Sequence, residues 1–352
     1  MKRLLIISKQ QFGTLTDVLK WSENLRHDFE VTVLCFNTGS KKVSIPGVRV
    51  IYVPYTRVYL INALLFYIYA IYCIFRSGVV LIEYFHGCVY LRKIFRNKPM
   101  LLDVRTLAVS KNESDRAKYN DGLIRASVYF NDITVVSEGV KEFFSNIDSN
   151  IYVMPLGADV ISRSIKTYEH LELLYVGTLS GRDIEKTIEG FNMFLQRVPN
   201  AKVKYHILGD ANTQEEYQSI EHLVEDLNLS DKVILYGRIP YDELTQYFDR
   251  CNVGISFVPI TSYYDNQPVT KTFEYAMSGL VTIATATKEN RKVITDLNGI
   301  LINDESEDFA QALMHIYKNG KIFIDSSIRA SVDAYNWSSL VKNNLLPILK
   351  KL

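Results

Sequence analysis

One short segment in the second half of the chain carries residues suited to binding an anion. Pro268 stands where a helix would begin, and Lys271 and Glu274 lie three positions apart on one face of its first turns. Free amides and the dipole at a helix N-terminus attract a phosphate, and a lysine ammonium adds a full positive charge. A carboxylate one turn further along can accept hydrogen bonds from two hydroxyls, such as those of a ribose. The spacing alone leaves a surface Lys–Glu ion pair open as the alternative.

A second candidate is the loop that follows a strand predicted over Leu171–Val176. Gly177 and Thr178 come directly after this strand, so their amides can approach a phosphate closely, and Arg182 or Lys186 can neutralise its charge. The loop is neither a G-x-G-x-x-G motif nor a P-loop. An ordinary strand-to-helix turn is the alternative here.

A third loop, Gly237–Pro240, also follows a predicted strand, and Arg238 or the backbone there can meet a nucleotide base. A plain turn is again the alternative. No G-x-G-x-x-G follows the first strand of either half, which disfavours a dinucleotide oxidoreductase. No Asp-x-Asp pair, C-x-x-C or His/carboxylate spacing indicates a metal site, so we expect chemistry without a metal.

The elements that position these loops alternate in type along the chain. Short β-branched runs alternate with segments of helical period, which is the pattern of parallel sheets with helices on both faces. Strands are predicted at residues 4–8, 30–36, 49–53, 79–84, 100–104, 133–136, 151–154, 171–176, 203–208, 232–236, 253–257, 281–284 and 299–302. Among the predicted helices are Leu60–Arg76, an apolar run too short to span a membrane, Ile322–Ala334 and Trp337–Leu352.

Length and charge agree with two domains that do not bind nucleic acid. The chain has 352 residues, with 40 Lys and Arg against 39 Asp and Glu, so no global basic field is available for a polyanion. The α/β pattern predicts two Rossmann-like, doubly wound domains facing each other across a cleft. Residues 1–157, completed by the helix 337–352, form the first; 158–170 are a linker; 171–336 form the second.

Several strings occur in the order typical of one enzyme family. They are Pro155-Leu-Gly-Ala-Asp159, Leu-Tyr-Val-Gly177, Ile207-Leu-Gly-Asp210, Val-Ile-Leu-Tyr-Gly237 and Gln267-Pro-x-x-Lys271-x-Phe-Glu274-Tyr-x-x-x-Gly279. On these strings the chain resembles GT-B glycosyltransferases, specifically glycosyltransferase family 4 (group 1), over essentially its whole length. The resemblance implies that the second domain binds a nucleotide-diphosphate sugar as donor, a UDP- or GDP-sugar, with no permanently bound cofactor.

The resemblance also implies individual roles. Glu274 would hold the ribose hydroxyls, Lys271 and Arg182 the diphosphate, and the amides at Gly177 the distal phosphate. Ile239 and its backbone would flank the base. Four further positions inside or beside the matching strings are assigned to donor binding: Gly209, Asn266, Gln267 and Thr270.

Four positions depart from the family pattern or lie on the acceptor side. Asn266 stands where a second glutamate is common, which leaves the donor sugar open, and Asp265 or Gln267 can share that role. Arg105 stands where a loop histidine is frequent; it cannot act as a base but can bind a phosphate or an acceptor carboxylate. Gly13, after the first strand, lies in the loop that in this family approaches the acceptor and the diphosphate. His86, after the strand 79–84, is a further candidate for the cleft, and a structural loop histidine is the alternative.

We therefore expect a hexosyl-type, metal-independent glycosyltransferase, with retention of anomeric configuration implied by the resemblance. Its acceptor is expected to be a saccharide or lipid-linked saccharide in cell-surface polysaccharide or glycoconjugate synthesis. Basic and aromatic residues interleave over 86–98, which favours a cytoplasmic enzyme held peripherally on anionic lipid at the inner face of the plasma membrane; a solvated cationic face is the alternative. A GT-B-shaped epimerase and a non-catalytic nucleotide-sugar binder or scaffold stay open as other functions.

Overall fold

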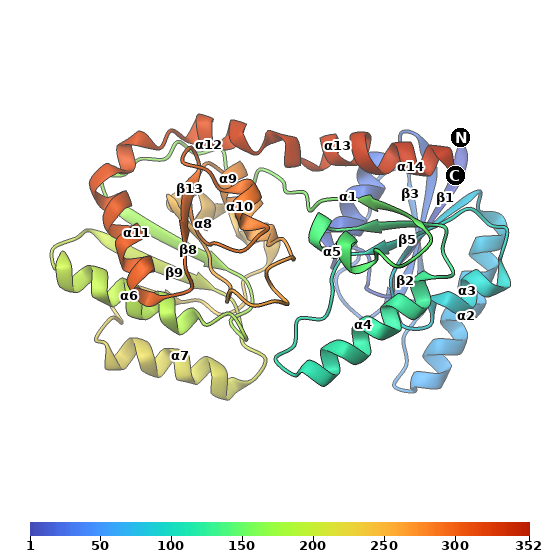
Figure 1. The fold of residues 1–352 in the computed structure, drawn as a ribbon, viewed down its shortest axis with the longest axis horizontal. Helices are drawn as coiled ribbons and strands as arrows, with labels where there is room; N and C mark the ends of the chain where they lie inside the picture. The colour runs from blue at the N-terminus through green and yellow to red at the C-terminus, as the bar shows by residue number, and fades with distance from the viewer. The chain divides into compact units, whose positions relative to one another are not determined.

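A computed structural model describes all residues from 1 to 352 and confirms an α/β fold with two parallel sheets. The chain divides into two units. Unit 1 comprises Met1–Gly157 and Trp337–Leu352, and unit 2 comprises Ala158–Asn336. Figure 1 shows that the red C-terminal segment returns to the blue and cyan N-terminal unit.

Unit 1 is built on a seven-stranded parallel sheet with the order β3-β2-β1-β4-β5-β6-β7. Its strands are β1 (Lys2–Ile7), β2 (Phe29–Asn37), β3 (Val48–Pro54), β4 (Val79–Glu83), β5 (Met100–Val104), β6 (Asp132–Val135) and β7 (Asn150–Val153). Its helices are α1 (Thr16–Leu25), α2 (Tyr59–Arg76), α3 (Cys88–Ile94), α4 (Glu113–Ser127), α5 (Glu138–Phe143), α13 (Trp337–Leu340) and α14 (Leu346–Lys351). Within β1, Leu5 and Ile7 face one core and Leu4 and Ile6 the other, since both faces of the sheet are covered.

The two cores of unit 1 have different helices. Side chains of α2, α3, α4 and α5 belong to one core, and those of α1 and the terminal helices to the other. Trp337 is buried against Gly157, where an added Cβ would lie 2.5 Å from the indole. The predicted single helix Trp337–Leu352 contains a π-helical turn over Val341–Leu345. Pro347, two residues after that turn, has no amide hydrogen to donate to the preceding turn and accounts for the bulge.

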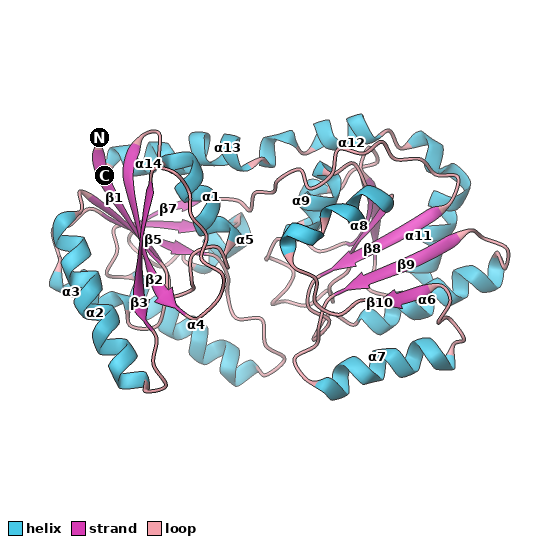
Figure 2. Cartoon of the chain, turned by 180° about the vertical axis from the view of Figure 1, so that it is seen from behind, coloured by secondary structure: helices cyan, strands magenta, loops and turns pink.

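Unit 2 has a six-stranded parallel sheet with the order β10-β9-β8-β11-β12-β13. Figure 2 shows β8, β9 and β10 side by side. Its strands are β8 (Leu171–Val176), β9 (Val203–Leu208), β10 (Val233–Leu235), β11 (Val253–Ser256), β12 (Val281–Thr285) and β13 (Gly299–Ile302). Its helices are α6 (Ile184–Arg197), α7 (Gln214–Asp226), α8 (Thr245–Arg250), α9 (Thr270–Met277), α10 (Asn290–Val293), α11 (Ser306–Asn319) and α12 (Asp325–Ser331). Because the strands are parallel, the loops after β8, β9, β10 and β11 all leave the same edge of the sheet.

Two segments of unit 2 differ from the sequence-based expectation. The predicted helix Ile322–Ala334 is interrupted, because Phe323 and Ile324 adopt extended backbone and the Phe323 ring is buried; the α-helical part is only α12. Residues 158–170, expected as a linker, are hydrogen-bonded within unit 2. The backbone amides of Ile161 and Ser162 donate to the Ser278 hydroxyl, and Arg329 donates to the carbonyl of Ser162.

Candidate functional site: an anion-binding cavity in unit 2

The central feature of unit 2 is a buried lysine without a hydrogen-bond acceptor. Lys271, in the first turn of α9, is 9% exposed, and its ammonium lies 3.7 Å from the centre of the Tyr175 ring. No ion pair joins it to Glu274, so a surface Lys–Glu pair does not occur here. Burial and the nearby Arg182 charge hold the Lys271 pKa well below its ordinary value. A charged ammonium in this position needs an anion, since a ring face replaces only part of its hydration.

Arg182 is the second cation of this group. Its guanidinium lies 4.6 Å from the centre of the Tyr264 ring, and the Tyr264 hydroxyl donates to the Gly181 carbonyl at 3.2 Å. The aromatic contact and the Gly181 bond hold the loop after β8 near Lys271. Two neighbouring cations repel each other unless a negative group lies between them, and a diphosphate supplies such a group.

Glycines allow three loops to meet beside Lys271. A Cβ at Gly177 would lie 3.3 Å from the Lys271 ammonium, and the φ angle of Gly177 is 143°. A Cβ at Gly209 would overlap the Gly177 carbonyl oxygen at 1.8 Å, and the Gly209 amide donates to the Gly237 carbonyl at 2.8 Å. The loops after β8, β9 and β10 therefore approach one another through backbone atoms alone.

These loops enclose a cavity of about 400 Å³. It is lined by Val176, Gly177, Thr178, Leu208, Gly209, Asp210, Ala211, Asn212, Arg238, Ile239 and Leu244. Five residues predicted from the sequence are thus brought together: Gly177, Thr178, Gly209, Arg238 and Ile239. The wall combines backbone amides, one exposed arginine and apolar side chains, the mixture that a nucleotide base and phosphate require.

Glu274 lies one turn after Lys271 on α9 and is partly exposed. Burial and the negative charge of Asp159 raise its pKa to about 7, although the Lys271 charge opposes the rise. The Tyr241 phenol is near enough that the Glu274 charge, added to burial, helps raise its pKa. A carboxyl group that titrates near neutrality beside a buried ammonium is a typical feature of a functional site. Neither Asp159 nor Tyr241 was predicted, because their role depends on packing across unit 2.

The loop before α9 holds the remaining predicted donor residues. Gln267 is buried and its amide donates to the Tyr263 carbonyl at 2.7 Å. Asn266 is partly exposed, and Thr270 is the first residue of α9. Asp265 accepts a hydrogen bond from the Lys288 amide at 2.7 Å, so its carboxylate already has a partner. Both alternatives to Asn266 thus have hydrogen-bond partners inside unit 2.

Lys186 does not join the cavity. Its ammonium donates to the Asp304 carbonyl at 2.5 Å and lies 3.6 Å from a Glu305 carboxylate oxygen. Both partners belong to the segment before α11. The two cations proposed from one loop thus separate, and of these two only Arg182 stays near Lys271.

In unit 1, Arg105 is held by partners inside the fold. Its guanidinium lies 3.1 Å from Asp17 and 3.2 Å from Asp103, and it donates to the Met154 carbonyl. These groups balance the Arg105 charge inside the fold and take up part of its donors, so binding of a phosphate or an acceptor carboxylate by Arg105 stays a prediction. His86, after β4, is exposed, and Gly13, after β1, has a φ of 96° and lies against Val43.

Glu83, which was not predicted, ends β4 at the carboxyl edge of the unit 1 sheet. Its carboxylate accepts a hydrogen bond from the Ser8 hydroxyl at the end of β1. Burial, and the charges of Asp103 and Asp17, raise its pKa to about 7. The sequence signal that would have found it is a charged residue closing an apolar strand, at the edge where such sheets bind ligands.

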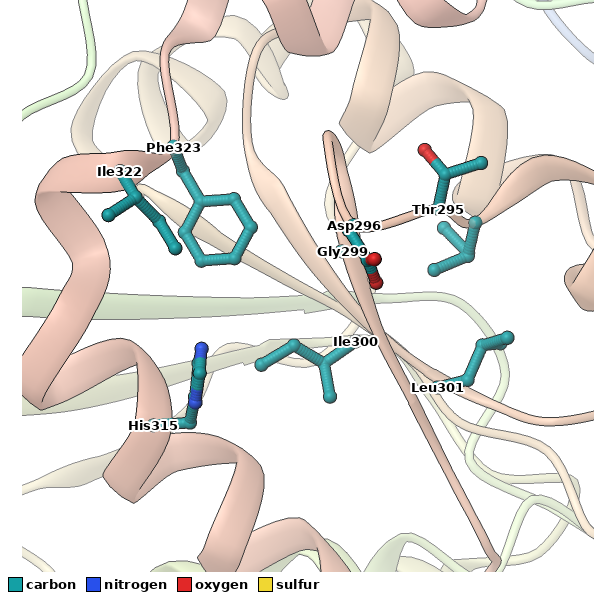
Figure 3. A pocket seen from close by; sticks show the side chains of 9 residues that line it. Thr295, Asp296, Gly299, Ile300, Leu301, His315, Ile322 and Phe323 are labelled. Carbon is teal, nitrogen blue, oxygen red and sulfur yellow. The ribbon is translucent and has the colours of Figure 1, made fainter.

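Two further observations concern other places in the chain. A cavity of about 510 Å³ lies against β13, and Figure 3 shows the side chains of Phe323, His315 and Ile300 that line it. It contains none of the predicted residues. No group of three or more His, Cys, Asp or Glu side chains is arranged to hold a metal ion.

The sheet orders, the returning terminal helix and the glycine-lined cavity define the class: the chain has the GT-B fold. Over its whole length it is similar to sucrose-phosphate synthase from Thermosynechococcus elongatus, with 17% identity, coverage of 100% and 98% of the two chains and a TM-score of 0.74. It is also similar to HepE from Anabaena in complex with UDP and glucose, with 11% identity, full coverage of both chains and a TM-score of 0.77. WaaG, a glycosyltransferase involved in lipopolysaccharide biosynthesis, matches with 15% identity, coverage of 98% and 99% and a TM-score of 0.68.

Sequence comparison identifies the family through unit 2. Residues 170–319 match the model of the glycosyl transferases group 1 family. No curated protein matches the chain. The family match covers unit 2 alone, and together with the fold it confirms the resemblance to group 1 glycosyltransferases noted from the motifs.

Proposed function

We propose that the chain transfers a hexosyl group from a nucleotide-diphosphate sugar, with UDP as the first nucleotide to test. The observation that carries this proposal is the partnerless, buried Lys271 ammonium at Gly177, beside the glycine-lined cavity. HepE, a protein of the same fold, was solved with UDP-glucose, which supports a nucleotide-sugar donor. GDP-sugars are the next candidates.

Each group at the cavity has a stated part in donor binding. Lys271 and Arg182 would neutralise the diphosphate and stabilise the charge that develops on it as the sugar leaves. Glu274 would accept hydrogen bonds from the ribose hydroxyls in its carboxylate form. Arg238 and Ile239 would contact the base, and the Gly177 and Thr178 amides the distal phosphate.

We propose a reaction without a metal, because the Lys271 and Arg182 charges would stabilise the leaving diphosphate. Retention of the anomeric configuration is proposed from the resemblance to the family. Unit 1 would bind the acceptor, a saccharide or lipid-linked saccharide of cell-surface polysaccharide or glycoconjugate synthesis. WaaG, involved in lipopolysaccharide biosynthesis, and WaaB, a lipopolysaccharide outer core galactosyltransferase, support this class of acceptor. A cytoplasmic enzyme that meets the membrane's inner face would suit it.

The test is a thermal-shift screen against UDP-, GDP-, dTDP- and CMP-sugars, because a ligand that binds only the folded state raises its apparent stability. We expect one nucleotide class to raise the unfolding temperature, with Glu274→Ala abolishing the shift and Lys186→Met, on the neighbouring helix α6, keeping it. The absence of any shift would refute the donor site. Binding followed by no sugar transfer or donor hydrolysis would favour the non-catalytic binder.

A further inference from the structure

Helix α2 (Tyr59–Arg76) has two apolar faces, of which unit 1 covers only one. Asn62, Phe66, Ala70, Cys73 and Ile74 are buried against the sheet. The other face is solvent-exposed and equally apolar. Its large exposed side chains are Tyr59 (73%), Leu60 (76%), Ile61 (45%), Leu64 (62%), Ile68 (52%), Ile71 (37%), Tyr72 (52%) and Phe75 (80%).

A surface helix of a soluble protein normally has charged residues on its outer face, whereas α2 has none between Tyr59 and Phe75. At 18 residues the helix is long and apolar enough to cross a membrane by length and composition, which corrects the expectation that this run is too short. Its inner face is nevertheless packed on β1, β2 and β3. Only its outer side is therefore free, along the length of the helix, to contact another apolar surface. An exposed apolar patch of this extent marks an interaction surface.

The charges around this face have one sign. Between Tyr55 and Pro99 the chain has six basic residues and a single acidic one, Glu83, which is bonded to Ser8. Helix α3 packs against α2 (Figure 1). It adds the exposed side chains Tyr90 and Ile94. Within the basic stretch 86–98, however, Arg92 and Lys98 donate to the carbonyls of Tyr129 and Ser77. Two cations of that stretch thus have partners inside unit 1, and most of the exposed apolar side chains of this face lie on α2.

A cationic hollow adjoins the C-terminal end of α2. Arg3, Arg49 and Arg76 line a cavity of about 100 Å³ together with Tyr72. Arg76 lies 4.6 Å from the centre of the Tyr72 ring. Glu30 is the only carboxylate that lines the hollow, so three guanidinium groups face one negative charge. Arginine suits phosphate recognition because its planar donors match two phosphate oxygens.

We propose that α2 lies flat in the interface of a membrane containing anionic phospholipid. The stripe Leu60–Phe75 would enter the acyl boundary, and the Arg3–Arg49–Arg76 hollow would take a lipid phosphate at the edge of the helix. Tyrosines at the ends of the stripe suit the headgroup region, where an aromatic ring with a polar tip is favoured. This surface is distinct from the donor cavity, and lipid binding needs neither donor nor acceptor.

The experiment measures binding of the full chain to vesicles of phosphatidylcholine with and without phosphatidylglycerol, by co-sedimentation at low salt. We expect binding to the anionic vesicles and at least a tenfold lower partition coefficient for Leu64→Asp with Ile68→Asp. The matched control is Leu297→Asp with Ile324→Asp, two equally exposed residues of unit 2 that add the same charge. The control should change the partition coefficient less than twofold. Replacing Arg3, Arg49 and Arg76 by Gln should weaken binding to anionic vesicles about tenfold. The matched control replaces Arg163, Lys202 and Lys318 of unit 2 by Gln. It removes the same charge and should change vesicle binding little.

Three results would overturn the proposal. The first is that the unmodified chain does not bind anionic vesicles. The second is that both Asp pairs lower the partition coefficient equally. The third is a dimer without lipid that Leu64→Asp with Ile68→Asp dissociates, which would assign the face to a second copy. Circular dichroism and thermal unfolding establish that each variant is folded. Donor-induced stabilisation should be the same in all of them, so failure of membrane binding and failure of the donor site are separate results.

Discussion

Replacing Lys271 by Met should have opposite effects on the free protein and on its donor complex. Met keeps most of the side-chain volume and its contact with the Tyr175 ring but removes the charge. In the free protein the ammonium is buried without a hydrogen-bond acceptor. Exchanging such a charge for a well-packed apolar group stabilises a fold by about 1 to 3 kcal/mol. For a unit of this size that corresponds to a rise in unfolding temperature of roughly 2 to 4 °C per kcal/mol.

The same change should weaken donor binding. A charged hydrogen bond to phosphate contributes about 1.5 to 3 kcal/mol, which corresponds to an increase in Kd of about 10- to 150-fold. Thermal unfolding without ligand, and calorimetric titration with the nucleotide sugar found in the screen, measure the two effects separately. Lys186→Met is the control: it removes one hydrogen bond and one exposed ion pair on α6 and should leave donor affinity unchanged.

The sign of the stability effect also depends on pH. The Lys271 pKa is lowered in the folded state, so the folded chain binds fewer protons than the unfolded chain between that lowered pKa and 10.5. Stability of the unmodified protein then rises with pH in that window. The stabilising effect of Lys271→Met should be largest below it and should shrink as pH rises through it. A Met variant that is less stable without ligand, or that keeps full donor affinity, would refute the reasoning.

Three other substitutions test the fold around the two sites. Gly209→Ala would place a Cβ 1.8 Å from the Gly177 carbonyl oxygen. We expect urea unfolding to show destabilisation by about 3 kcal/mol, together with loss of donor binding. Normal donor binding by this variant would contradict the prediction. Arg105→Met would leave Asp103, 1% exposed, without its counter-charge, and should destabilise unit 1 by about 3 to 5 kcal/mol; a neutral effect would show that the ion pair is dispensable. The Glu83 pKa rises from 4.5 to about 7 on folding, so the contribution of Glu83 to stability falls as pH rises through that window. Glu83→Gln should therefore stabilise the chain by up to about 3 kcal/mol at pH 8 and not at pH 4. Equal effects at both pH values would argue against the shift.

The strands and the donor cavity follow from local sequence to a large extent. Every predicted strand lies within two residues of an observed one, because buried parallel strands are continuous apolar runs that end at glycine or polar residues. The loops carrying Gly177, Gly209 and Gly237 could likewise be placed, since each follows a strand. Gly209 must be glycine because the Gly177 carbonyl lies against it. This requirement arises from two loops together, so it cannot be predicted from either segment alone.

Tertiary contacts decide the points that the sequence left open. The segment Leu60–Phe75 reads as a buried or interfacial helix, and periodicity alone does not distinguish these alternatives when both faces are apolar. The structure shows both at once: Phe66 and Ala70 are buried in unit 1, while Leu64 and Ile68 are exposed. An apolar residue can satisfy either environment, so only the position of the sheet assigns the faces.

The two buried cations show why residue type is an incomplete guide to function. Lys271 and Arg105 were both proposed as anion ligands, and each lies in a loop or first helical turn after a strand. Arg105 has two carboxylates and a carbonyl around it, so its charge is balanced inside the folded chain and contributes to stability. Lys271 has an aromatic ring, a neighbouring arginine and no hydrogen-bond acceptor, so its burial disfavours the free protein until an anion arrives. A buried charge with partners is explained by the fold, whereas one without partners requires a ligand.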